Sequence, residues 1–425
     1  MRIEKYDNIM KALASLICDT EFENHVFSVG GCVRDKRLGM EIKDIDLVVD
    51  LPNGGIELAK YFESKGYTKG SIVVYENYGT VMFKLKQFPD IELEAVQTRK
   101  EDYHDAKTRN PVTCFGTIQE DCHRRDFTIN ALYYNVSEGK EYDFNGNSLK
   151  DLKTGVIDTC GDPDIIFDED PLRILRAVRF SSKLRYPISE RTKAGIRRHK
   201  SRLDIISQER ITDEINKILS GPNPEAGMEL LHVLNLTEIV LPEMKEILAY
   251  NLYEVIKDMH NIRVQAIENN LDQLTLMLSY ISYKVNPIIF KASMRRMRYS
   301  SEMIDKVFLY AFLLDKAIFV SEFHSIVHLR ELGYLVKTKE NYDMLLALVE
   351  AIKQRIWDKM KQEPPYNMFG YTLPVNGNDI MDTLGIGPGH MIRAVQEDLL
   401  CDAFVNPNLS KEECIELIKI RFANK

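Results

Sequence analysis

The segment 27–50 constrains the fold of this chain more than any other stretch. It contains a short helical pattern that ends at Gly39, followed by a strand pattern centred on the triplet from Asp44 to Asp46. Successive side chains of a strand point to opposite faces, so the two aspartates share one face. The apolar run at 47–49 is typical of a strand that is covered on both sides. The segment therefore predicts an α/β unit with two carboxylates on a buried strand.

This acidic pair predicts a divalent cation site. Neighbouring carboxylates repel each other, and Mg²⁺ binds one or two carboxylates together with substrate phosphates. Two such ions can hold both oxygens of an in-line phosphoryl displacement. Gly30 and Gly31 let the backbone approach a triphosphate, and Arg34 adds a positive charge one turn later. We therefore expect a nucleotide site with two Mg²⁺ ions on Asp44 and Asp46. The glycine spacing of a dinucleotide-binding fold, G-x-G-x-x-G, is absent from this segment.

Three strings of the chain resemble one protein family. GGCVRD followed by DID resembles the first motif of the class II tRNA nucleotidyltransferase and bacterial poly(A) polymerase family, within the polymerase β superfamily. RRDFTINA at 124–131 matches the family motif RRDFTxNA without departure, and EDPLR at 169–173 matches EDxxR. The resemblance covers residues 27–220 well and is weak across 240–360.

The resemblance implies a third acidic group on a strand beside the first two. The segment 91–96 alternates as a strand does and places Glu92 and Glu94 on one face. Alignment with family strands favours Glu94 as the catalytic partner of Asp44 and Asp46. Glu92 is the alternative, and the pattern itself leaves open that both glutamates face solvent.

The resemblance also assigns nucleotide contacts to the RRDFTINA string. It implies that Arg125 and Asp126 contact the ribose and triphosphate, with Asn130 in support. A ribose 2′-hydroxyl both donates and accepts hydrogen bonds, so a carboxylate and a guanidinium can each bind it. The alternative for this string is a helix start with an ion-paired arginine doublet.

The EDPLRILRAVRF string carries the expected base readers. Cytosine and adenine both offer an amino donor beside a ring-nitrogen acceptor, whereas uracil and guanine offer the reverse. A carboxylate with a guanidinium can therefore accept C and A and refuse U and G. By resemblance, we assign Asp170 and Arg173 to the base, and Arg176 and Arg179 to the phosphates. The alternative is that Asp170 only caps a helix that starts at Pro171, beside a solvated arginine stripe.

An RNA partner must be held by local basic patches, because the chain has a formal net charge of −8. One candidate stretch is 191–202. The other is 294–299, in which Arg295, Arg296 and Arg298 are the expected RNA contacts. Solvated helix faces are the alternative explanation for both stretches.

We expect an α+β protein: a polymerase-β-like nucleotidyltransferase head with a mixed sheet, followed by an all-helical neck, body and tail. The chain is too long for one core, and its helical pattern from about 168 onward is broken by proline- and glycine-rich joints. The expected domains are 1–150 (head), 151–225 (neck), 226–362 (body) and 363–425 (tail).

The polar segment 98–122 is too long for a tight turn and predicts a functional loop. In the resembled family such a loop accompanies addition of the terminal adenosine. We therefore expect CCA addition to tRNA from CTP and ATP. The alternatives are a poly(A) polymerase, an enzyme that adds A only, and a silent RNA-binding relative. No membrane partner is expected, protein partners remain open, and scattered cysteines without a CxxC pair favour the cytoplasm.

Overall fold

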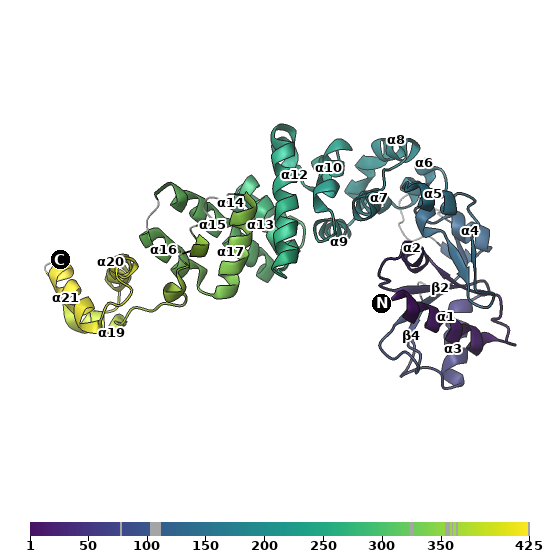
Figure 1. Cartoon of the computed structure of the whole chain (residues 1–425), viewed down its shortest axis with the longest axis horizontal. Helices are drawn as coiled ribbons and strands as arrows, with labels where there is room; N and C mark the ends of the chain where they lie inside the picture. Colours follow the sequence, from purple (N-terminus) through teal and green to yellow (C-terminus); the bar gives the residue numbers. More distant parts are fainter. Residues whose placement is uncertain are drawn as a thin grey trace. The chain divides into compact units, whose positions relative to one another are not determined.

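The computed structural model describes residues 1–425 except 77–78, 103–111, 324–325, 353–357, 359, 363 and 424–425. Its chain divides into two compact units (Figure 1). The first comprises Met1–Gly221 and Leu230–Val240, and the second comprises Pro222–Glu229 and Leu241–Lys425. The finer division into head, neck, body and tail stays a prediction.

The first unit is built on a seven-stranded mixed sheet with strand order β3-β4-β5-β2-β1-β8-β9. β2 pairs with β5 in parallel, and the other neighbours in this order are antiparallel. Its strands are β1 Val26–Val29, β2 Ile45–Val49, β3 Val73–Tyr75, β4 Thr80–Phe83, β5 Leu93–Gln97, β8 Tyr133–Asn135 and β9 Lys140–Tyr142. The expected mixed α/β head is confirmed.

The central strand β2 carries the apolar run that the sequence singles out. Leu47, Val48 and Val49 are all buried, as expected for a strand covered on both faces. Val48 packs in a core cluster with residues of β1, β8 and the helix α4 (Ile118–His123). We expected Asp44 to lie within this strand. The strand begins at Ile45, so Asp44 is the residue before it.

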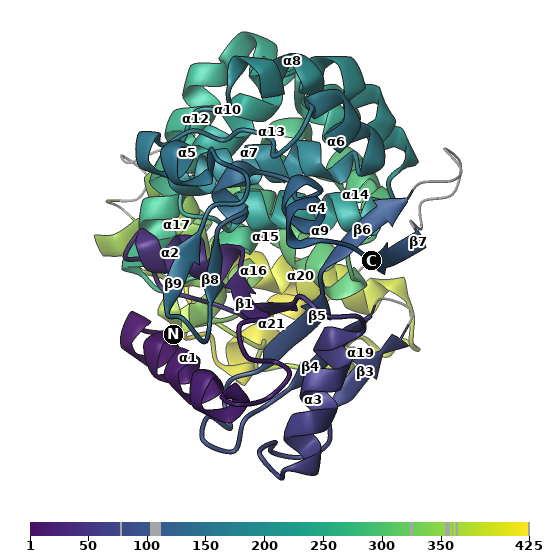
Figure 2. The same cartoon turned by 90° about the vertical axis from the view of Figure 1, so that its right-hand side faces the viewer.

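Helices pack on this sheet at close range. In the first part of the chain they are α1 Ile3–Ile17, α2 Gly31–Arg37 and α3 Gly54–Ser64. α3 packs against β2, β4 and β5 (Figure 2). A Cβ atom at Gly55 would lie 2.7 Å from the backbone nitrogen of Val96, so only glycine lets the helix come this near β5.

The segment 98–122, expected as a loop, contains regular structure at both ends. β6 (Arg99–Asp102) and β7 (Val112–Phe115) form a separate two-stranded antiparallel ribbon, and α4 follows directly. The hairpin pattern is missed from the sequence because every residue of β6 is charged, so this strand lacks apolar alternation, and β7 is only four residues long. Residues 103–111 of the expected loop lie outside the described residues.

The remainder of the first unit is helical. A 3-10 turn over Thr128–Asn130 precedes β8, and five helices follow the sheet. These helices are α5 Ser148–Thr154, α6 Pro163–Glu169, α7 Leu172–Leu184, α8 Glu190–His199 and α9 Gln208–Leu219. α7 packs against α9, and α6 packs against α8.

Helices also make up the second unit and the segment that leads into it. They are α10 Pro224–Val233, α11 Thr237–Val240, α12 Lys245–Glu268, α13 Gln273–Val285, α14 Pro287–Arg296, α15 Ser301–Phe323, α16 Ile326–Val336, α17 Lys339–Ile352, α19 Gly377–Leu384, α20 His390–Val405 and α21 Lys411–Phe422. The last three share a small core of their own.

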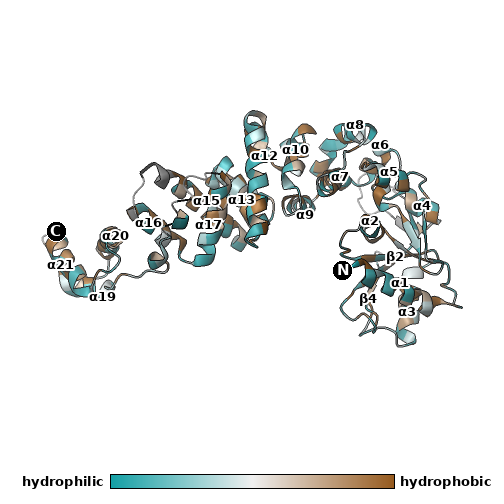
Figure 3. Ribbon diagram, in the orientation of Figure 1, coloured by the Kyte–Doolittle hydropathy of each residue, from teal (hydrophilic) through white to brown (hydrophobic). Residues whose placement is uncertain are grey.

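Every strand in the described part of the chain ends by Tyr142, which confirms the expected all-helical remainder. Its helices carry both hydrophilic and hydrophobic residues (Figure 3), as helices with one packed face do. Among the described helices, none has the length and apolar character needed to cross a bilayer.

Candidate nucleotide and metal site

Asp46 and Glu94 face each other across the parallel pairing of β2 with β5. The Asp46 side chain is exposed, but the surrounding protein atoms and the charge of Glu94 raise its pKa to about 6. Burial also raises the pKa of Glu94, and Asp44 and Glu92 add to that rise against the charge of Arg99. Since burial, together with the neighbouring acids, raises the pKa of both groups despite the nearby arginines, the pair suits a bound divalent cation.

The structure distinguishes the two candidates for the third acid. Glu94 lies within β5 opposite Asp46, whereas Glu92 precedes the strand and is exposed. Glu92 is 3.9 Å from Lys84, a long ion pair at the surface. The geometry favours Glu94. Asp44 is exposed before β2, and its charge acts on both Asp46 and Glu94.

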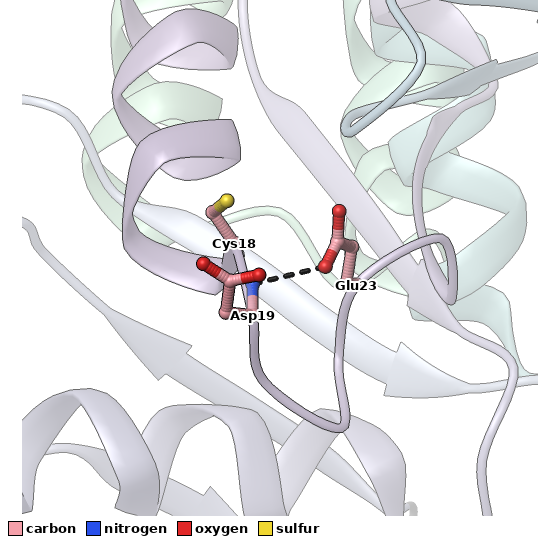
Figure 4. A group of neighbouring side chains, drawn as sticks. All are labelled: Cys18, Asp19 and Glu23. Carbon is pink, nitrogen blue, oxygen red and sulfur yellow. Dashed lines mark hydrogen bonds between the residues drawn. The ribbon is translucent and has the colours of Figure 1, made fainter.

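The described residues contain one group of three acidic or thiol side chains whose ligand atoms all lie within 4.8 Å of one another, and it lies elsewhere. It consists of Cys18, Asp19 and Glu23 (Figure 4). This group belongs to the turn after α1, where the Asp19 amide donates to Glu23 at 2.9 Å. The predicted metal acids, Asp44 and Asp46 with Glu94, do not form so tight a group, so their joint ligation stays a prediction.

Gly30 is the residue that brings the predicted site elements together. It precedes α2 with φ 81°, a left-handed conformation that favours glycine. A Cβ atom at Gly30 would lie 3.7 Å from Oδ2 of Asp46 and 4.0 Å from Nη1 of Arg125. Gly31 is the first residue of α2. The glycine turn, one acid and one predicted nucleotide-binding arginine therefore meet in one place.

Asp121 holds this arginine, and sequence reasoning missed it. Its fully buried carboxylate accepts hydrogen bonds from Arg124 at 2.5 Å, Arg125 at 3.0 Å and the Tyr133 hydroxyl at 2.7 Å. Burial opposes ionisation, but the two guanidinium groups outweigh it and hold the pKa of Asp121 well below its ordinary value. Asp121 and Arg125 are four residues apart, but Arg125 lies beyond the end of α4, so helical spacing alone does not reveal the pair.

Asp126, Asn130 and Arg34 form a second network. The buried Asp126 carboxylate accepts from Asn130 at 3.1 Å and from Arg176 at 2.8 Å. Burial raises the pKa of Asp126, yet Arg176 and the hydrogen bonds bring it down to about 2. The Asn130 amide oxygen accepts a hydrogen bond from Arg34, which also donates to Asp35 at 2.7 Å. Three predicted nucleotide-binding residues thus lie in one network with Arg176.

Asp170 binds the first turn of α7 through its side chain, whereas the N-cap position of this helix is Pro171. One carboxylate oxygen accepts from the amide of Leu172 at 3.1 Å, and the other accepts from Arg210 at 2.9 Å. We expected the helix to start at Pro171. It begins at Leu172, so Pro171 is the residue before it. Arg210 belongs to α9, so this bond links the start of α7 to α9.

Arg173 is turned inward. It is buried and donates to Glu169 at 2.7 Å and to the backbone oxygen of Ile166 at 3.1 Å. Asp170 and Arg173 therefore both have protein partners of their own in this structure. To hydrogen-bond a nucleotide base, Asp170 and Arg173 would have to give up some of these protein partners or bind the base in addition to them.

Arg176 and Arg179 occupy the next turns of α7. Arg179 Nε lies 3.2 Å from the buried carboxylate of Glu214 on α9. Burial lowers the pKa of Arg179, and the neighbouring charges of Arg176 and Arg34 lower it further against the attraction of Glu214. The two predicted phosphate contacts are thus held by acids from two different segments, Asp126 in the bend before the 3-10 turn and Glu214 on α9.

The two basic stretches both contain arginines that pair with acids. In the first, Arg191 pairs with Asp158, Arg198 with Asp164 and Arg202 with Asp168, at 2.6–2.8 Å. In the second, Arg296 pairs with Glu243 at 2.9 Å, and Arg295 and Arg298 are exposed. Contact of either stretch with RNA phosphates stays a prediction.

The fold and the acidic strand pair are those of a nucleotidyltransferase head. Residues 26–158 match the family model of the poly A polymerase head domain. Residues 185–248 match the model described as the probable RNA and SrmB-binding site of polymerase A. The resemblance found in the sequence is confirmed for these two segments, which are similar to the poly(A) polymerase and tRNA nucleotidyltransferase family, and nucleotidyltransferases of this kind depend in general on a divalent metal.

Two relatives agree with this similarity in sequence, and a solved structure shares the fold. The mitochondrial CCA tRNA nucleotidyltransferase of Candida glabrata is 34% identical over 229 residues, which cover 50% of this chain and 42% of the relative. The CCA-adding enzyme of Limosilactobacillus reuteri is 38% identical over 204 residues, covering 48% and 47%. The matches thus span less than half of each relative. A solved CCA-adding enzyme with ATP shares the fold, with a TM-score of 0.71 at 22% identity, covering 99% of this chain and 96% of that chain.

Proposed function

We propose that this chain is a template-independent RNA nucleotidyltransferase that adds or repairs the 3′-terminal CCA of tRNA. It uses CTP and ATP and releases pyrophosphate. The observation that carries the proposal is the Asp46–Glu94 pair beside the Gly30 turn, within a head whose sequence matches this family. Relatives named as CCA-adding enzymes support the choice of product.

Asp44 and Asp46 are the proposed ligands of two Mg²⁺ ions, with Glu94 as the third acid. The donor set fits, because carboxylate oxygens are the ligands that Mg²⁺ prefers, and burial and neighbouring acids raise the pKa of Asp46 despite the charge of Arg125. When bound, the ions activate the RNA 3′-hydroxyl and stabilise charge on the triphosphate. The protein's own part is to hold Asp46 on β2 and Glu94 on the neighbouring β5, with Asp44 directly before β2.

The nucleotide triphosphate is proposed to lie along the Gly30–Gly31 turn. Arg34 and Arg125 supply fixed positive charge there, each anchored by a buried acid, Asp35 and Asp121. Anchoring keeps both guanidinium groups in place before the substrate arrives, so little ordering is required on binding.

Base choice is proposed for Asp170 and Arg173. A carboxylate that accepts and a guanidinium that donates fit the edge shared by cytosine and adenine. Uracil and guanine would leave both charged groups unpaired, which is strongly disfavoured in a buried site. Arg176 and Arg179 are proposed to lie beside the phosphates.

One assay tests the proposal. Purified protein with Mg²⁺ is given tRNA that lacks its CCA end and each nucleoside triphosphate, singly and in pairs. We expect two C residues and then one A, with no extension beyond three and no use of UTP or GTP. An Asp44→Ala protein that kept activity would overturn the metal role, and failure of the wild-type protein to extend any RNA would overturn the function.

A poly(A) polymerase is the second candidate, favoured by the family model that the head matches. In the same assay it would incorporate ATP alone and extend the RNA far beyond three residues. Addition of A only to tRNA ending in CC would identify an A-adding enzyme instead. We also propose a cytoplasmic location. Because a yeast relative carries a mitochondrial name, subcellular fractionation is the test of this location.

A further inference from the structure

Phe180 lies at the centre of the arginine groups of the nucleotide site. It is a residue of α7 and is only 7% exposed. Three guanidinium carbons lie over its ring, at 4.6 Å for Arg179, 5.1 Å for Arg34 and 5.4 Å for Arg176, measured to the ring centroid. All three distances are within the range of a cation–π interaction.

The three arginines come from two parts of the first unit and repel one another. Arg34 belongs to α2 beside the glycine turn, whereas Arg176 and Arg179 belong to α7. Their acidic partners Asp35, Asp126 and Glu214 each come from a different element, so no single carboxylate holds the group together. The face of the Phe180 ring is the surface that all three share.

We infer that Phe180 is a positioning residue, which holds Arg34, Arg176 and Arg179 in one cluster for the triphosphate of the incoming nucleotide. Its negative ring face attracts cations without presenting a charge that would compete with the phosphate. A carboxylate at this place would attract the arginines but repel the ligand. This inference rests on the proposed function, because the triphosphate is its ligand.

The incomplete satisfaction of Arg179 agrees with such a cluster. Its Nε and the facing Glu214 Oε2 are buried at 3.2 Å, yet neither has a hydrogen-bond partner in the described structure. Arg179 is also the arginine nearest the Phe180 ring. Its guanidinium is therefore held mainly by charge and by the ring, and it keeps hydrogen-bonding capacity for an anion.

The test replaces Phe180 with phenylalanine analogues that carry one, two or three ring fluorines. Fluorination weakens the negative ring face while the shape is nearly kept. We expect log KM for CTP and ATP to rise stepwise with fluorine number, to about three- to tenfold at three fluorines. The melting temperature should change little, and kcat should change less than KM. Phe180→Leu gives the same direction where it folds.

Phe62 provides the matched control. It is fully buried in α3 and contacts Tyr67 and Phe83 edge-on, and no cation lies over its ring among the described residues. The same fluorine series at Phe62 should leave KM unchanged. A KM that does not depend on fluorine number at Phe180, or that depends on it equally at Phe62, overturns the inference while the proposed function stands.

A second measurement separates the proposed nucleotidyltransferase function from the positioning role of Phe180. Binding of inorganic tripolyphosphate is measured by calorimetry for the wild-type protein and the fluorine series, without any RNA or base. If the wild type incorporates no nucleotide, the proposed function fails. A graded loss of tripolyphosphate affinity would then still support Phe180 as the positioning residue, and constant or absent tripolyphosphate binding would overturn it.

Discussion

Two acidic regions of the same unit behave in opposite ways. At the β2–β5 pairing, Asp46 faces Glu94 and its pKa rises to about 6. At the start of α7, Asp126 faces Arg176 and its pKa falls to about 2. Arg176 compensates the charge of Asp126, whereas the pKa of Asp46 stays raised although Arg125 acts on it.

This difference distinguishes structural acids from functional ones. Asp121 and Asp126 are buried and held by arginines, so they fix the positions of those arginines. Asp46 remains exposed, and its nearest acidic partner increases its energy when both are ionised. A site that stores such repulsion becomes favourable only when a cation from solution is bound, which is the property a metal-dependent transferase requires.

The largest expected effect is on activity at the uncompensated acid. Asp46→Asn should lower nucleotide incorporation by about a thousandfold or more, because a metal ligand is lost. The melting temperature without metal should stay the same or rise, since repulsion with Glu94 is removed. Added Mg²⁺ should raise the melting temperature of the wild type more than that of the variant. The exposed Glu57→Gln on α3 is the control and should keep activity.

The next effect is on stability at the compensated acid. Asp121→Asn should lower the free energy of unfolding by about 3–5 kcal/mol, because two arginines lose a fully buried partner. Urea unfolding followed by circular dichroism measures this. Asp164, which also binds two basic groups but at the surface, is the matched control. Asp164→Asn should cost much less than Asp121→Asn, because exposed ion pairs contribute little to stability, and equal costs would contradict the comparison.

A smaller effect separates the two glutamates. Glu94→Gln should reduce kcat about a hundredfold, because it removes the third acid opposite Asp46. Glu92→Gln should stay within about twofold, since Glu92 makes only a long surface contact with Lys84. Single-turnover incorporation into tRNA ending in CC measures both. The reverse result would transfer the catalytic role to Glu92 and show that strand register does not choose the acid.

Much of this comparison was available from the sequence, and its limits have physical causes. Period-two alternation predicts the buried strand, and whole-motif matches predict that Arg125, Asp126 and Asn130 belong to one site. Asp121 was missed because its importance comes from being fully buried, which local pattern does not report. The ribbon of β6 and β7 was missed because β6 is charged at every position, so it lacks the apolar alternation that marks a half-buried strand.

The partners of α7 were also beyond the sequence. Residues three or four positions apart in the sequence lie on one face of a helix, but this spacing does not show which residues pack against that face. Asp170 binds Arg210 across a separation of 40 residues, and Arg179 meets Glu214 of another helix. Long-range pairs of this kind depend on tertiary packing, so local sequence can name the arginines without naming what holds them.

The smallest effect is a pH dependence that has opposite signs in the two regions. The pKa of Asp126 lies below its unfolded value, so its contribution is present above about pH 4 and is lost as the pH falls toward about 2. Asp126→Asn should therefore be about 2 kcal/mol less stable than wild type at pH 7 and equal to it near pH 2. Urea midpoints across this range measure the difference.

The pKa of Asp46 is raised, so without metal the wild type should lose stability as pH rises from about 4 to about 6. Asp46→Asn should then match wild type at pH 4 and exceed it at pH 7, by less than about 1 kcal/mol because the side chain is exposed. Mg²⁺ at pH 7 should remove this advantage, because the ion neutralises the repulsion that the substitution relieves. If both variants changed stability with the same sign, the two regions would not differ in compensation, and the argument for a cation at β2 would lose its basis.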